Sequence, residues 1–341
     1  MERTGGAPLL VLTHLTPDPD ALGALVGVRR LVGEGFGLPV RVATAGRIHR
    51  AENRAMVREL ELAFEPLEAA AREPGAGVVL VDSQPGFGHT VLPEGLPVLA
   101  VFDHHEVSGA AAARLAAVPH ADVRPELGAT SSLVYAYLRD SGVGLDRSSA
   151  TALFCGVRFD TGDLAFDVTP LDEEAYFETL RRADRLMVAR ILRPPLPPAY
   201  YGELRRSLQL SHRHGPLVLG LLGRVGNPES VAEMADFYLR MEGCHVAIVG
   251  GAFEDTYSLS VRTDPRRLRA RAVLERLLDG AGTFGGHGGV AGARIPLAAH
   301  DPLGSLDVDG LEAELRGRAL AVVADAGDAP SDGEGGRPLS S

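Results

Sequence analysis

The tripeptide Asp103-His104-His105 is the first stretch of this sequence whose residue types suggest chemistry. It follows the apolar run 96–102, which predicts a buried strand of a parallel sheet. Such strands present functional groups at their carboxyl ends. A carboxylate beside two imidazoles offers hard oxygen and borderline nitrogen donors together, a mixture that suits Mn²⁺, Zn²⁺ or Fe²⁺ better than Ca²⁺. An exposed polar turn after a strand is the structural alternative for the tripeptide taken alone.

Further candidates follow other predicted elements. The runs 8–13 and 77–81 are short and continuously apolar, and each ends in polar residues. A predicted helix at 147–157 runs into another carboxylate. We expect the side chains at these ends to meet at one edge of the sheet. Together with one histidine of the tripeptide, the candidate metal ligands are His14, Asp18, Asp20, Asp82, His104 and Asp160.

The segment after the first strand is stiffened by Pro17 and Pro19 and leads into a predicted helix at 21–32. Asp20 is a candidate N-cap for that helix, which is the structural alternative to a metal-binding role. One histidine and two aspartates within seven residues exceed what capping alone requires.

Six ligands of these types fit two neighbouring divalent ions. Ions about 3.5–4 Å apart can share a bridging hydroxide and stabilise both the attacking and the leaving oxygen of an in-line displacement. Such a site takes roughly six or seven ligands, one of them a bridging carboxylate. His105 would then be free beside the metals to donate a proton to the leaving oxygen or to hold the phosphoryl group. Asp103 would orient a ligand without touching a metal.

Composition narrows the function further. The formal net charge of −11 argues against a broad binding surface for duplex DNA or an anionic membrane. All 34 basic residues are Arg, so Schiff-base chemistry on Lys and a Walker-type phosphate loop are excluded. Any phosphate clamp must use Arg, which can bind oxyanions through two parallel hydrogen bonds. Arg47 and Arg50, after a predicted strand at 39–44, are either such contacts or solvated charges at a helix start.

The two cysteines, Cys155 and Cys244, are far apart and lie in apolar sequence, which is typical of packed thiols in a cytosolic protein. The N-terminal region lacks the pattern of a secretory signal, and no run of about 18 apolar residues occurs. We therefore expect a cytoplasmic protein without a membrane-spanning helix.

A proline-rich segment divides the chain after a predicted helix around 171–192. Four prolines in five positions between Arg193 and Ala199 cannot continue a helix or pair inside a sheet. The run that begins at 325 is polar and rich in Gly, Ser and Asp, which is typical of disorder. The predicted organisation is a first domain at 1–192, a linker at 193–200, a second domain at 201–324 and a disordered tail at 325–341.

The second half alternates predicted strands at 216–222, 245–251 and 256–262 with a helix near 266–279. The segment 280–289 that follows contains six glycines around one histidine. Glycines expose backbone N–H groups and allow a ligand to approach the chain closely. We interpret this segment as a binding loop, with a flexible connector as the alternative.

Taken together, these elements resemble the DHH/DHHA1 phosphoesterase superfamily. This superfamily includes RecJ nucleases, manganese inorganic pyrophosphatases, cyclic-dinucleotide phosphodiesterases and nanoRNase/pAp phosphatases. The matching elements occur in family order: His14-x3-Asp18-x-Asp20-Ala21, Asp82, Asp103-His104-His105, Asp160-Thr161-Gly162 and Gly285-Gly286-His287. The sequence departs from the family pattern at Pro19, in the shorter glycine run before His287, and at Arg158, where an uncharged residue is common.

The resemblance implies an α/β fold in which a parallel-sheet DHH domain precedes a smaller α/β DHHA1 domain. It further implies two Mn²⁺ ions, with Mg²⁺ or Co²⁺ as substitutes. One ion would be bound by His14, Asp18 and Asp82, and the other by Asp20, Asp82, His104 and Asp160. The catalytic residues would be His105 and Asp103. Substrate would be held across the interdomain cleft by Arg262, Gly286, His287 and Gly288.

The expected activity is hydrolysis of short oligoribonucleotides, 3′-phosphoadenosine 5′-phosphate (pAp), or both, by the bridging hydroxide. At 341 residues the chain leaves no room for the extra OB-fold module of RecJ exonucleases, and aromatic residues make up only 5%. The expected partner is a small nucleotide or short RNA rather than long duplex DNA or a membrane, and a homodimer is compatible with the resemblance. The alternatives are a phosphodiesterase for cyclic or linear dinucleotides and a non-catalytic nucleotide-binding regulator. A pyrophosphatase is disfavoured because Lys is absent.

Overall fold

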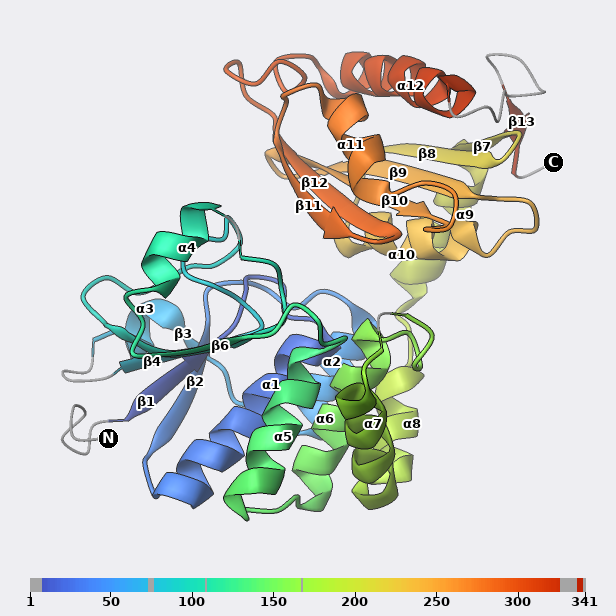
Figure 1. Ribbon diagram of the computed structural model, residues 1–341. Helices are drawn as coiled ribbons and strands as arrows, with labels where there is room; N and C mark the ends of the chain where they lie inside the picture. Colours follow the sequence, from blue (N-terminus) through green and yellow to red (C-terminus); the bar gives the residue numbers. More distant parts are fainter. Residues whose placement is uncertain (1–7, 73–76, 108, 167, 326–335, 340–341) are drawn as a thin grey trace. The chain divides into compact units, whose positions relative to one another are not determined.

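The computed structural model describes residues 8–72, 77–107, 109–166, 168–325 and 336–339 (Figure 1). The chain divides into two compact units, Met1–Pro195 and Leu196–Ser341. The division therefore falls inside the proline-rich segment. Each unit contains a sheet with helices on it, and the predicted fold class is confirmed: a parallel-sheet α/β unit precedes a second, smaller α/β unit.

The sheet of the first unit has six strands in the order β3-β2-β1-β4-β5-β6, and every neighbouring pair is parallel. In this order the chain progresses outward in both directions from β1 and β4. Ligand sites of open parallel sheets lie outside the carboxyl ends of the strands at such a switch point. The strands are β1 (Leu9–Leu12), β2 (Val40–Thr44), β3 (Glu65–Pro66), β4 (Gly77–Val81), β5 (Val98–Asp103) and β6 (His120–Val123).

Both faces of this sheet are buried, which explains the continuous apolar runs of the sequence. In β1, Leu9 and Val11 pack toward α1 and α5, while Leu10 and Leu12 pack toward α3 on the other face. The helical elements are α1 (Pro19–Arg30), the π-helix η1 (Leu31–Gly35), α2 (Ala51–Glu59), α3 (Leu67–Ala70), α4 (Gly109–Leu115), α5 (Thr130–Ser141), α6 (Arg147–Asp160), α7 (Pro170–Arg182) and α8 (Arg185–Leu192).

Close helix packing positions the loops that carry the candidate ligands. A Cβ atom added at Gly23 of α1 would lie 2.7 Å from the carbonyl oxygen of Ala152 in α6. A glycine is required at this crossing because any side chain would push the two helices apart. The start of α1 and the end of α6 are thereby held close together.

The second unit contains a seven-stranded mixed sheet in the order β11-β12-β10-β9-β8-β7-β13. Among the described strands of this second sheet, only β8 and β9 pair in parallel. Alternate residues of β8 pack against α11 and α12 on one face and against α10 on the other. The elements are α9 (Pro198–Leu210), β7 (Ser211–His214), β8 (Leu217–Arg224), α10 (Glu229–Leu239), β9 (Val246–Phe253), β10 (Thr256–Thr263), α11 (Ala270–Leu278), β11 (Thr283–His287), β12 (Val290–Pro296), α12 (Val308–Asp325) and β13 (Arg337–Pro338).

Three expectations differ from the observed elements. The region predicted as one helix after Leu171 is two helices, because Asp184 caps a new one by accepting hydrogen bonds from the N–H groups of Leu186 and Met187. The glycine-rich segment is not all loop, since β11 pairs with β12. Of the tail predicted to be disordered, 326–335 and 340–341 lie outside the described residues, and β13 pairs with β7. None of the helices in the described ranges combines the length and apolar character needed to cross a bilayer.

Candidate metal centre

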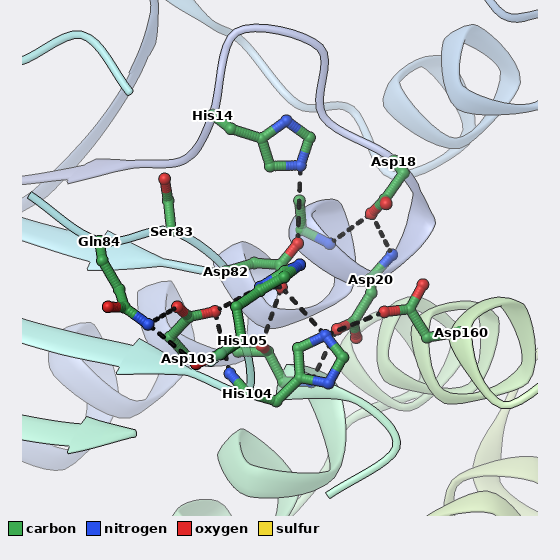
Figure 2. Close-up of polar contacts among 12 residues, drawn as sticks. His14, Asp18, Asp20, Asp82, Ser83, Gln84, Asp103, His104, His105 and Asp160 are labelled. Atoms are coloured by element: carbon green, nitrogen blue, oxygen red, sulfur yellow. Dashed lines mark hydrogen bonds and ion pairs between the residues drawn. The ribbon is translucent and has the colours of Figure 1, made fainter. Parts of the chain in front are cut away.

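The six predicted ligands converge at the carboxyl edge of the first sheet (Figure 2). They form overlapping groups in which the ligand atoms lie within 4.8 Å of one another. Asp82 and His104 each belong to two groups, so the groups form one connected cluster. The groups are His14, Asp18 and Asp82; Asp20, His104 and Asp160; and Asp82, His104 and His105.

Asp82 lies at the centre of the cluster. It follows β4 in a left-handed conformation, with φ of +53°, which Asp tolerates better than most residues. Its Oδ2 atom lies 3.6 Å from Nε2 of His14, and its Oδ1 atom lies 3.8 Å from Nε2 of His104. Because its two oxygens face different groups, this carboxylate is placed to bridge two cations.

Asp18 and Asp20 both stay in the cluster but accept hydrogen bonds from different helix starts. Asp18 is the N-cap of α1, and its Oδ1 atom accepts hydrogen bonds from the N–H groups of Asp20 and Ala21, each at 3.0 Å. The prediction that Asp20 caps this helix is therefore wrong. The Asp20 carboxylate instead accepts hydrogen bonds from the N–H groups of Thr130 at 2.7 Å and Ser131 at 2.8 Å, at the start of α5.

Thr130 and Ser131 are supporting residues that sequence reasoning missed. Thr130 also donates from Oγ1 to Oδ1 of Asp82 at 2.9 Å, so it contacts two candidate ligands. No sequence pattern predicts the contact between Thr130 and Asp20, since the two residues are 110 positions apart. The start of α5 additionally places a positive helix dipole end against the Asp20 carboxylate.

His104 has the orientation expected of a metal ligand. Its Nδ1 atom lies 3.1 Å from the carbonyl oxygen of Leu127, to which it can donate a hydrogen bond. Nε2 then faces the cluster, 3.2 Å from Oδ2 of Asp160. This buried Nε2 makes no aligned hydrogen bond within the described part of the chain. An imidazole fixed by a carbonyl on one side, with its other nitrogen directed at carboxylates, fits a divalent cation.

His105 and Asp103 form a pair beside these ligands. Nδ1 of His105 donates to Oδ1 of Asp103 at 2.8 Å, and the same oxygen accepts from the N–H of His104 at 2.9 Å. Gln84, also missed by the sequence analysis, donates from Nε2 to Oδ2 of Asp103 at 2.7 Å and to the carbonyl oxygen of His105 at 3.0 Å. Asp103 is buried and holds the His105 ring in place.

Burial of so many carboxylates has an electrostatic cost. Burial, together with the charges of Asp160 and Asp82, raises the pKa of Asp18 to about 7 and that of Asp20 well above its ordinary value. Burial would also raise the pKa of Asp82, but the hydrogen bond from His14 and the charges of His105 and His104 hold it well below its usual range. Divalent cations would remove this repulsion, so the donor set fits them.

The residues predicted to bind substrate belong to the second unit. Arg262 lies buried in β10, where Nε donates to Asp236 and Nη1 donates to Oγ of Ser260 at 2.8 Å. Gly286 and Gly288 have positive φ values of +146° and +50°. The side chain of His287 lies outside the described part of the chain. The predicted roles of these four residues stay predictions.

The chain is similar in sequence or in fold to several known proteins. No protein-family model matches the chain. Over 327 residues, 94% of the chain, it is 30% identical to an uncharacterized protein of Methanocaldococcus jannaschii, of which it covers 65%. Over 155 residues, 45% of the chain, it is 27% identical to a probable manganese-dependent inorganic pyrophosphatase of Streptococcus agalactiae, of which it covers 48%. The chain thus spans less than two thirds of either relative.

Among solved structures, an exopolyphosphatase-related protein from Bacteroides fragilis superposes with a TM-score of 0.71, covering 92% of both chains at 14% identity. This likeness shows a shared fold. With the motifs in family order and their side chains gathered at one edge, the resemblance to the DHH/DHHA1, RecJ-like phosphoesterases is confirmed.

Proposed function

We propose that this protein is a divalent-metal-dependent phosphohydrolase that cleaves short oligoribonucleotides, pAp, or both. The observation that carries the proposal is the position of Asp82, whose two oxygens face two groups of ligands. A single structural cation would not need such a double-sided arrangement.

The chain's own residues divide into two sets. One Mn²⁺ would be held by His14, Asp18 and Asp82, and a second by Asp20, Asp82, His104 and Asp160. Two such ions, when bound, supply a hydroxide nucleophile near neutral pH and neutralise charge on the phosphoryl oxygens. The N–H groups of Thr130 and Ser131 donate to the Asp20 carboxylate and would keep it in place while charge develops on the phosphoryl oxygens of the substrate.

His105 is placed to act as the general acid. Burial lowers the pKa of His105, but the hydrogen bond to Asp103 and the charge of Asp82 outweigh burial and raise it to about 9. In the metal-free protein the imidazole is therefore protonated at neutral pH. Because Nδ1 is occupied by Asp103, the proton for the leaving oxygen would come from Nε2.

The names of the relatives support the class of reaction and leave the substrate open. One is described as a manganese-dependent pyrophosphatase and another as exopolyphosphatase-related. Both names concern hydrolysis of phosphate linkages. The preference for short RNA or pAp rests on the low aromatic content of the sequence, 5%, which offers few surfaces on which the bases of a long single strand could stack.

The test is a substrate panel with Mn²⁺: pAp, RNA of two to five nucleotides, cyclic di-AMP, its linear product and pyrophosphate. Asp82→Asn should reduce turnover by about a thousandfold, since bound metal contributes several kcal/mol to such reactions. Asn keeps the size of Asp and tolerates the positive φ. Asp140→Asn, at an exposed carboxylate of the same unit, is the matched control and should retain full activity.

Turnover that is equal in the wild type and Asp82→Asn would refute the metal mechanism. Mn²⁺ and nucleotide binding without turnover of any panel member would favour the non-catalytic regulator. Turnover of only the cyclic and linear dinucleotides would favour the dinucleotide phosphodiesterase.

A further inference from the structure

A cavity of about 150 Å³ lies in the first unit, where the ends of four helices meet. Its walls come from the start of α1, the start of α2, the last turn of α6 and the last turn of α8. Three charged side chains line it together with apolar ones. The lining includes Pro19, Phe159 and Ile191 on the apolar side and Arg50, Glu52 and Arg158 on the charged side.

The cavity is built by segments that also carry metal ligands. Pro19 stands between Asp18 and Asp20, and Phe159 directly precedes Asp160. Arg50 follows β2, whose carboxyl end opens at the same sheet edge as that of β1 because the two strands are parallel. The cavity and the metal cluster therefore share two chain segments, the start of α1 and the end of α6.

The charged groups of the cavity are already balanced by carboxylates. Nη2 of Arg158 donates to Oδ2 of Asp163 at 2.7 Å, and Nε of Arg50 lies 3.5 Å from Oε2 of Glu52. A bare phosphate would have to compete with both carboxylates. A group with less charge avoids this competition.

The volume of the cavity and the contact between Arg50 and Phe159 favour a flat, aromatic ligand. The guanidinium carbon of Arg50 lies 5.5 Å from the centroid of the Phe159 ring, on its face. Aromatic and guanidinium planes are the surfaces on which bases of single-stranded RNA stack. A cavity of roughly 150 Å³ in another protein holds one benzene molecule, so the volume suits a ring rather than a whole nucleotide.

We propose that this cavity binds one nucleobase of the substrate. Because Arg50 and Phe159 already contact each other, the base would stack against this pair from outside rather than between them, and the Glu52 carboxylate would accept a hydrogen bond from an exocyclic amino group. The proposal treats Arg158, where the sequence departs from the family pattern, as part of the charged wall of the cavity, paired with Asp163. It rests on the proposed function for the nature of the substrate and not for the binding itself.

The experiment is equilibrium binding of AMP and ribose 5-phosphate to the full-length protein with Mn²⁺, measured by calorimetry. The two ligands share the sugar and the phosphate, so the ratio of their affinities reports the base alone. The wild type should bind AMP about tenfold more tightly or better, as stacking on aromatic side chains gives. Phe159→Ala and Arg50→Gln should move the ratio toward one, and Glu52→Gln should lower it by a smaller factor.

Arg54→Gln is the matched control, since Arg54 is exposed on the same helix one turn from Arg50. It should leave the ratio unchanged. Phe159→Leu, together with circular dichroism, separates loss of the ring from loss of the fold. Because Phe159 adjoins Asp160, only the ratio is interpreted, and a general loss of phosphate binding cancels from it.

Equal binding of AMP and ribose 5-phosphate by the wild type would overturn the proposal. A ratio that Phe159→Ala and Arg50→Gln leave intact would also overturn it, because the base would then lie elsewhere. Equal weakening of both ligands by Arg50→Gln and Arg158→Gln would instead assign the cavity to phosphate. Since the readout is binding, a protein that hydrolyses no substrate but shows the expected ratios would refute the proposed function and keep the base site.

Discussion

The two units balance their buried charges in opposite ways. In the first unit, Asp18, Asp20 and Asp82 lie together at the sheet edge, and the first two have raised pKa values because carboxylates repel one another where water is scarce. In the second unit, the guanidinium of Arg262 is met by the carboxylate of Asp236 and by neutral acceptors in its own strand. The first site is short of positive charge, whereas the Arg262 pair is balanced within its own unit.

The two sites differ in whether their charges indicate a ligand. A cluster that repels itself requires something from outside, so its geometry indicates a cation even before activity is known. A paired, buried arginine is equally consistent with a structural role and with binding of an anion. The metal site can therefore be argued from contacts, while the substrate-binding role of Arg262 depends on family resemblance.

The largest expected effect comes from metal itself. Mn²⁺ at a hundred times its dissociation constant should stabilise the first unit by about 2.7 kcal/mol per site. Hydrogen exchange followed by mass spectrometry can locate this effect. Protection should increase in the segments around Asp20, Asp82 and His104, and β10 of the second unit should change little. Equal protection in both units would show that the effect of the metal is not confined to the first unit.

A change at a helix contact should act on the same site indirectly. A Cβ atom at Gly156 of α6 would lie 2.1 Å from Oγ of Ser131 and 2.9 Å from Oδ1 of Asp20. Gly156→Ala should therefore destabilise the protein by about 1–3 kcal/mol and weaken Mn²⁺ binding, because Asp20 has to move. Denaturant unfolding and Mn²⁺ titration measure the two effects.

Gly202→Ala in α9 is the matched control for this prediction. Apart from its chain neighbours and the backbone of its own helix, no described atom lies within 4 Å of a Cβ placed at Gly202. Alanine in a helix interior is favoured over glycine by roughly 0.5–1 kcal/mol, so this variant should be as stable as the wild type or more so. An equal loss of stability in both variants would show that contact with Asp20 is not the cause.

The pH dependence should also differ between metal-free and metal-bound protein. The pKa of Asp18 is about 7 in the folded chain and near 3.8 for an unperturbed aspartate, so the folded state binds more protons between these pH values. This group's contribution to the stability of the metal-free protein is therefore present at low pH and is lost as pH rises through about 7.

Metal binding should show the opposite trend, since a carboxylate must lose its proton to coordinate a cation. Mn²⁺ affinity should rise by about tenfold or more per pH unit between pH 6 and 7 and go on rising above pH 7, because Asp20 and His104 also have raised pKa values and must lose their protons to bind a cation. Titrations at pH 6, 7 and 8 measure this. Affinity that is independent of pH would mean that Asp18 is not a ligand that titrates in this range.

The candidate ligands were accessible to sequence reasoning because each of them follows a recognisable element. His14, Asp82 and His104 come after apolar strands, and parallel strands bring their carboxyl ends to one edge. The fold class followed from the same alternation of strands and helices. Local pattern was sufficient where the chain itself carries the residue to the site.

The supporting contacts were inaccessible for the opposite reason. Thr130 and Gln84 act through hydrogen bonds that only the assembled helices and loops create. The positive φ of Asp82 has no sequence signal, since Asp occurs in many turns. The N-cap was assigned to Asp20 rather than Asp18 because both are good capping residues, and the choice depends on where Pro19 starts the helix.

The smallest expected effect concerns the pair of Arg262 and Asp236 in the second unit. Asp236→Asn should lower the stability of the second unit by about 1 kcal/mol, because Asp236 is partly exposed and solvent screens its pairing with Arg262. Glu275→Gln, at an exposed pair with Arg271, is the control and should change stability by less than about 0.5 kcal/mol. Hydrogen exchange in β10 measures both. Mn²⁺ affinity should be unchanged in both variants. A lower affinity in Asp236→Asn alone would mean that the Arg262 pair is coupled to the metal ligands. The two sites would then not balance their charges independently.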